Sequence, residues 1–112
     1  MSKFSFEDIG AVTATFAAGD GVKGGQVVKL TGNGTVDACA DGDKFCGVAM
    51  EPRKGGAAVQ VKGFVTVPCS GELTVGWAIL AANGQGGVKA AAEGVSALIV
   101  SVGADGTAVI CL

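Results

Sequence analysis

Residues 25–62 read GQVVKLTGNGTVDACADGDKFCGVAMEPRKGGAAVQVK, and residues 76–112 read GWAILAANGQGGVKAAAEGVSALIVSVGADGTAVICL. In each stretch a glycine opens an apolar segment, an Asn-Gly pair follows (Asn33-Gly34 and Asn83-Gly84), and a Gly-x-Ala-Val sequence stands near the end. A unit of this size cannot bury its own apolar faces. The two degenerate repeats are therefore predicted to fold together as a single β domain over residues 9–112.

Alternating β-branched residues predict strands, and glycine-rich turns separate them. Residues 59–67 place valines at every second position on either side of Gly63, which predicts one half-buried strand. The apolar segment 27–30 precedes Gly32-Asn33-Gly34, which is a strong hairpin signal. Turn signals of this kind recur about every 8–12 residues, as in a sandwich or barrel. The predicted fold is all-β, a small β-barrel or sandwich built from the two repeats.

Composition excludes several classes of function. The net charge is −2 and the basic residues are scattered, which argues against a nucleic-acid binder. The longest apolar run, residues 77–82, is far shorter than a membrane-spanning helix. Glu7 and Asp8 stand where a secretory signal would have its apolar core, so synthesis in the cytoplasm is expected. Hydrophobic residues make up 49% of the chain; either another subunit covers part of the surface, or small alanines raise the mean hydropathy.

No side chains are arranged in a pattern typical of catalysis or metal binding. The chain has no histidine, which removes the commonest general base and most zinc sites. Cys39, Cys46, Cys69 and Cys111 are widely and irregularly spaced, so structural thiols are expected rather than disulfides or metal ligands. We therefore predict no catalytic residue, no metal and no cofactor.

Two weaker motifs have plain explanations. Gly19-x-Gly21-x-x-Gly24 matches a dinucleotide-binding pattern, but a strand follows it where that motif requires a helix. A glycine-rich turn is the better interpretation. Asp37, Asp41 and Asp43 lack the ordered spacing of a calcium loop, so they are expected to be solvated loop acids.

A few large apolar side chains are candidates for an interface. Trp77, the sole tryptophan, is either a core residue by default or an aromatic anchor at an interface or carbohydrate site. Phe64 shares its predicted strand face with polar residues, which favours exposure to a neighbour. Leu98 and Val100 belong to the segment 95–102, which is apolar on both faces. Such a strand is either central in a barrel or packed against another subunit.

The first eight residues are predicted to form an N-terminal arm. They lack strand alternation, yet Phe4 and Phe6 fall on one face of an extended chain. The arm is either a disordered terminus or a segment that adds itself as a strand to a partner.

The order of elements resembles the bacteriophage capsid cement (head decoration) proteins. The resemblance lies in Ala17-Ala18-Gly19-Asp20, Gly25-Gln26-Val27-Val28, Gly47-Val48-Ala49 and the final segment 106–112. It implies a β-rich homotrimer, made in the host cytoplasm and seated on the outer capsid surface, that binds the major capsid protein and reinforces the expanded shell. It brings no catalytic residues. The four cysteines and the tryptophan depart from the pattern expected of that family.

The sequence thus predicts a structural virion protein of a phage or prophage rather than an enzyme. The alternative is a small β-barrel module that binds carbohydrate or peptide, for which an exposed Trp77 would be diagnostic. Neither interpretation involves nucleic acid or membrane.

Overall fold

The computed structural model describes residues 10–112, and the regular structure in this part of the chain is entirely β-strand. The predicted all-β fold is confirmed. No helix able to cross a bilayer occurs among these residues. The predicted arm, residues 1–8, lies outside them. The strands are β1 (Val12–Ala18), β2 (Val27–Gly32), β3 (Thr35–Ala38), β4 (Gly47–Ala49), β5 (Gly56–Lys62), β6 (Phe64–Pro68), β7 (Gly76–Ala82), β8 (Val88–Ala90), β9 (Val95–Val102) and β10 (Thr107–Cys111).

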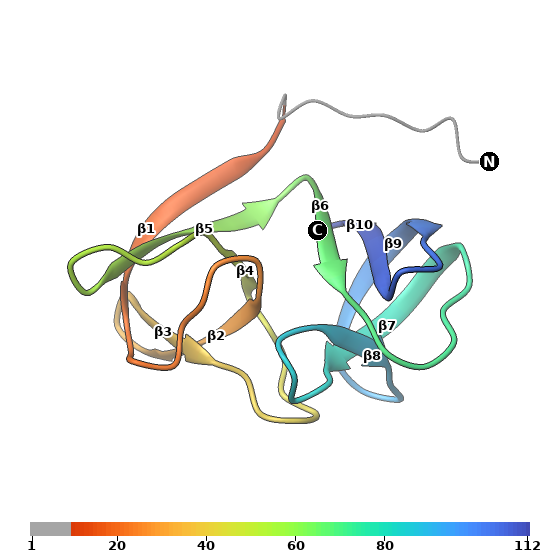
Figure 1. Cartoon of the computed structure of the whole chain (residues 1–112), viewed down its shortest axis with the longest axis horizontal. Coiled ribbons are helices and arrows are strands. Elements are labelled where there is room, and N and C mark those ends of the chain that lie inside the picture. The colour runs from red at the N-terminus through yellow and green to blue at the C-terminus, as the bar shows by residue number, and fades with distance from the viewer. Residues whose placement is uncertain (1–9) are drawn as a thin grey trace.

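The first five strands close into a barrel in the order β1-β3-β2-β4-β5, on the left of Figure 1. β5 runs antiparallel to β1, whereas β1 and β3 pair in parallel through Ala17 and Ala18. The turn at Asn33-Gly34 joins β2 to β3, so the predicted hairpin is confirmed. Gly34 has a φ of 64°, a conformation that glycine adopts without steric cost.

The last five strands repeat this pairing scheme on the right of Figure 1. They form a sheet in the order β6-β10-β9-β7-β8, and each pair has a counterpart five strands earlier. A parallel bridge between Cys69, just after β6, and Val88 in β8 stands where β1 meets β3 in the barrel. The two halves of the described chain therefore share one topology, which includes β1 and β6 as well as the two repeats.

Strand pairing also shows which residues of the two halves are structurally equivalent. Ala57 in β5 lies opposite Phe16 in β1, and Ala108 in β10 lies opposite Val67 in β6. Both alanines are buried. Aligning the two Gly-x-Ala-Val sequences, residues 56–59 and 106–109, would instead match Ala57 with Thr107, which precedes Ala108 by one residue. Because side chains alternate between faces, burial identifies Ala108 as the equivalent position.

Two hydrophobic cores fill the molecule, and only the first belongs to one half. The first lies inside the barrel, and all of its buried residues come from the first half. The second combines the inner face of the second sheet with three side chains that point outward from the barrel. These three are Val27, Phe45 and Val48.

Backbone hydrogen bonds also join the halves where the loop between β3 and β4 meets the end of β7. Gly42 N–H donates to the Ala82 carbonyl at 2.8 Å, and Ala82 N–H donates to the Asp43 carbonyl at 2.9 Å. Nearby, Val27 N–H donates to the Gly86 carbonyl at 3.0 Å. These bonds and the shared core hold the two halves as one unit.

The predicted single strand over residues 59–67 is wrong, because the chain changes sheet at Gly63. This glycine has a φ of 101°, and a Cβ added there would lie 3.0 Å from Ala11 Cα. Gln60, only 8% exposed, donates from Nε2 to the carbonyls of Lys62 at 3.1 Å and Phe64 at 2.9 Å. The predicted polar face of the strand thus contains the side chain that holds the junction between β5 and β6.

We expect Gln60→Met to lower the free energy of unfolding by about 1–3 kcal/mol, because two carbonyls at the junction lose their donor while side-chain volume is kept. Chemical denaturation measures this. Lys62→Met, at an exposed position of the same strand, is the control and should change stability by less than about 0.5 kcal/mol. Equal stabilities of the two variants would contradict a role for the Gln60 amide.

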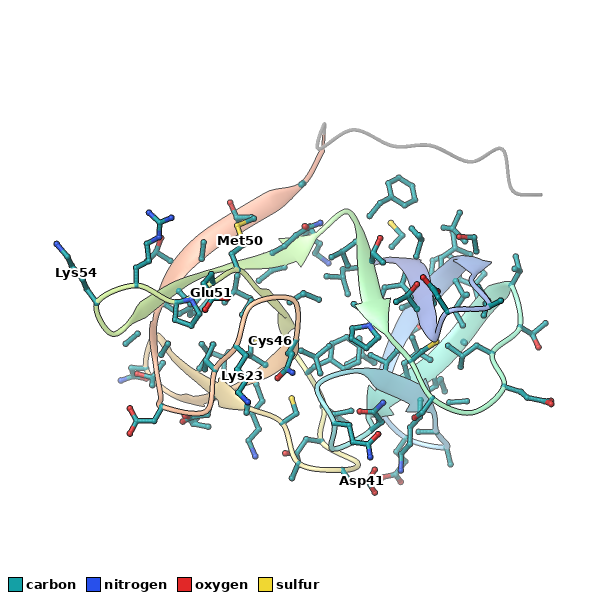
Figure 2. The ribbon with its side chains drawn as sticks, in the orientation of Figure 1. Lys23, Asp41, Cys46, Met50, Glu51 and Lys54 are labelled. Carbon is teal, nitrogen blue, oxygen red and sulfur yellow. The ribbon has the colours of Figure 1, made fainter. Side chains whose placement is uncertain are left out.

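The basic segment after β4 forms a two-residue hairpin turn at the outer tip of the barrel, where Figure 2 labels Lys54. Arg53 and Gly56 exchange backbone hydrogen bonds of 2.8 and 3.0 Å. Lys54 and Gly55 have φ values of 51° and 77°. Positive φ at both central residues defines a type I′ turn, for which Asn-Gly is the favoured sequence.

Replacing Lys54 by Asn should therefore raise the free energy of unfolding by roughly 0.5–1 kcal/mol, since asparagine tolerates the left-handed region better than lysine. The matched control is Lys44→Asn, at an exposed lysine without positive φ. A thermal melt compares the two. A gain of the same size in both variants would show that the turn is not its source.

Candidate interaction face

Four neighbouring strands bring three of the candidate interface residues into one row. Trp77 in β7 pairs with Leu98 in β9, Leu98 pairs with Cys111 in β10, and Cys111 pairs with Phe64 in β6. Adjacent strands lie about 4.8 Å apart, and directly paired residues project from the same face of a sheet. We call the outward side of β6, β7, β9 and β10 the Trp77 face.

The Trp77 face points away from the core. Leu80, Ile99 and Ile110 are buried on the opposite side of the sheet. Trp77 is 76% exposed and Ile79, two residues along the same strand, is 44% exposed. The default expectation that Trp77 packs in the core is therefore wrong, and the aromatic-anchor interpretation remains.

The four strands of this face carry no charge, and the edge strand β8 places Lys89 beside Ala81 at its border. The sequences of β6, β7, β9 and β10 contain no Asp, Glu, Lys or Arg on either side. Its polar groups are small hydroxyls, such as Ser96, which pairs with Ile79, and Thr66, which pairs with Val109. Because charged residues are depleted at the centres of protein interfaces, this composition is typical of a surface that another protein subunit covers.

The remaining candidate that the structure describes, Val100, does not join this row. Val100 is half-buried and is the extra residue at a β-bulge between β9 and β10, so it stands outside the row. Phe4 and Phe6 fall outside the described residues. The sequence analysis did not select Ile79 and Cys111, although the alternation of Trp77 and Ile79 along one strand would have indicated the first of them.

Asp41 and Asp43, two of the clustered aspartates, make separate contacts. Asp43 accepts hydrogen bonds from Lys29 Nζ at 2.6 Å and Ala40 N–H at 2.8 Å. The bond from Lys29 holds the pKa of the Asp43 carboxyl below its ordinary value and raises the pKa of Lys29. Asp41 pairs with Lys89 at 2.8 Å. Residues 10–112 contain no group of three or more His, Cys, Asp or Glu side chains placed to hold a metal ion.

The four cysteines are free thiols, each partly buried. Cys39 and Cys69 pack against the second core, and Cys46 packs against the first. Burial raises the pKa of Cys39 to about 11 and raises the pKa values of Cys46 and Cys69. These three thiols resemble small apolar side chains more than nucleophiles.

The glycine motif at residues 19–24 lies in the loop between β1 and β2, so its interpretation as a turn agrees with the structure. An open hollow of about 470 Å³ lies on the barrel half, where Figure 2 labels Met50 and Glu51. Thr15, Arg53 and three small residues of β5 complete its lining. It contains one acidic and one basic side chain and no pair of carboxylates suited to acid–base catalysis.

No protein-family model matches this chain, and no curated protein is significantly similar to it.

The raised pKa of Cys39 predicts its reactivity. At pH 8 a thiol with a pKa of about 11 instead of 9.0 holds roughly a hundredfold less thiolate, and the thiolate is the nucleophile. Alkylation of Cys39 in the folded protein should be slow at pH 8 and should accelerate up to about pH 11. Peptide mass spectrometry measures the rate. In urea the same cysteine should react at the ordinary rate, and an equal rate in the folded protein would contradict this assignment.

Proposed function

We propose that this chain is a structural virion protein that decorates the head of a phage or prophage and stabilises the shell by binding the major capsid protein. The observation that carries the proposal is the Trp77 face, an uncharged sheet surface with Trp77 exposed, which suits contact between the protein subunits of an assembly. A protein that clamps a lattice needs complementary surface and many repeated contacts, and it needs no activated side chain.

The internal construction of the molecule supports the same role. The second core contains Val27, Phe45 and Val48 from the first half, so relative movement of the halves would expose apolar surface. A decoration protein has to hold its contact surfaces at fixed positions against a shell. The resemblance to capsid cement proteins in the segments 17–20, 25–28, 47–49 and 106–112 agrees with this function.

A module that binds carbohydrate or peptide is the second candidate, and the 76% exposure of Trp77 favours it. Binding sites for small ligands combine an aromatic platform with a few polar groups that fix the ligand's orientation. The four strands of the Trp77 face contain no charged side chain, and no Asn or Gln. Sugar hydroxyls would find only serine and threonine there, so the capsid proposal is preferred.

The proposal is tested by producing the chain together with the major capsid protein of the phage or prophage genome from which its gene is taken. The chain should co-sediment with expanded shells, should be absent from unexpanded shells, and should raise the melting temperature of the expanded shells. Failure to bind expanded shells would overturn the capsid proposal. Quenching of Trp77 fluorescence by a panel of soluble glycans, without shell binding, would favour the second candidate instead.

A further inference from the structure

We infer that the Trp77 face is the surface through which copies of this chain associate, with the face of one copy meeting the same face of another. The inference deepens the proposed function and rests on it. It assigns the self-contact to the row Trp77, Leu98, Cys111 and Phe64 and to Ile79 beside it. Contact with the shell is then left to other surfaces of the molecule.

The distribution of charge selects a second copy as the occupant. The described charged residues all lie outside β6, β7, β9 and β10. A partner surface with ordinary charge density would leave ions desolvated and unpaired against this face, which is costly. The same face of another copy is equally free of charge, so the faces can meet without desolvating an ion on either side.

The clustering of exposed apolar side chains supports this choice. Val75, Trp77 and Ile79, three of the exposed large hydrophobic residues, stand at alternate positions, in or next to β7. Leu98 extends the same surface across β9 and is half-buried. Contact between two such faces would bring Trp77 of each copy into the interface, and large aromatic rings contribute most to the centre of such contacts.

The size of the face indicates how tight the association should be. Four strands about 4.8 Å apart, each with five residues or more at about 3.3 Å rise, present an area of roughly 15 by 17 Å, or about 250 Å². This area is smaller than the roughly 800 Å² that each partner buries in a standard interface. The assembly should therefore be reversible and depend on concentration in free solution, and become firm only where a lattice holds many copies together.

Trp77 is the only tryptophan, so its fluorescence reports directly on the face. The experiment records the emission maximum and acrylamide quenching of the purified full chain over a dilution series, beside sedimentation velocity on the same samples and without shells. In concentrated samples the protein should sediment as an oligomer, with blue-shifted emission and weak quenching. On dilution the mass, the emission and the quenching should change together over the same concentration range.

Ile79→Lys supplies the matching variant, because it places a charge on the face and keeps the tryptophan. We expect it to weaken association by roughly tenfold or more, since the lysine would be buried without a partner. Leu30→Lys is the control, at a 55% exposed leucine of β2 on the other half, and should associate like the parent chain. Circular dichroism of both variants confirms folding.

Three outcomes would overturn the inference. The first is a monomer at every concentration, and the second is an oligomer whose Trp77 emission remains red-shifted and fully quenchable. The third is a blue shift that occurs only when expanded shells are added, because the face would then belong to the capsid contact. Since the dilution series contains no shells, loss of self-association and loss of shell binding are separate results.

Discussion

Val27 and Val28 are neighbours in the chain, and each is completely or almost completely buried in a different core. Side chains alternate along a strand, so β2 presents Val28 to the barrel interior and Val27 to the second sheet. A slip of one residue in β2 would exchange the two side chains and disturb both cores at once. The other features of the molecule, including the rigid placement of its outer faces, depend on the first two residues of this strand being buried on both sides.

The sequence predicted the parts of the fold that local chemistry determines. Asn33-Gly34 is a hairpin signal because glycine adopts positive φ without steric cost, and the hairpin forms there with Gly34 at a φ of 64°. The change of sheet at Gly63 was not predictable from alternation, since valines at 59, 61, 65 and 67 keep the same period on both sides of the break. Periodicity records which face a residue occupies and contains no information on which sheet the strand joins.

The position of Trp77 shows a second limit of prediction from sequence, which concerns side-chain volume. In β7 the inward side of the second sheet takes Ala78, Leu80 and Ala82, while the larger Trp77 points outward. Small side chains suffice inside because Phe45 and its neighbours from the barrel fill the second core. The rule that the bulkier face of a strand is buried fails here, since the missing volume is supplied by Val27, Phe45 and Val48, which lie far earlier in the chain. No reading of one strand in isolation contains that contribution.

The asymmetry between the two cores also bears on how the molecule is made. The ribosome delivers the barrel first, and the barrel's core needs no residue from later in the chain. Domains generally fold in the order of synthesis, so the barrel can form while the second half is still emerging. Its outward-facing Val27, Phe45 and Val48 then offer a ready apolar template on which the second sheet condenses. Although the two halves share one topology, they would exchange places in the gene only at the expense of this order of assembly.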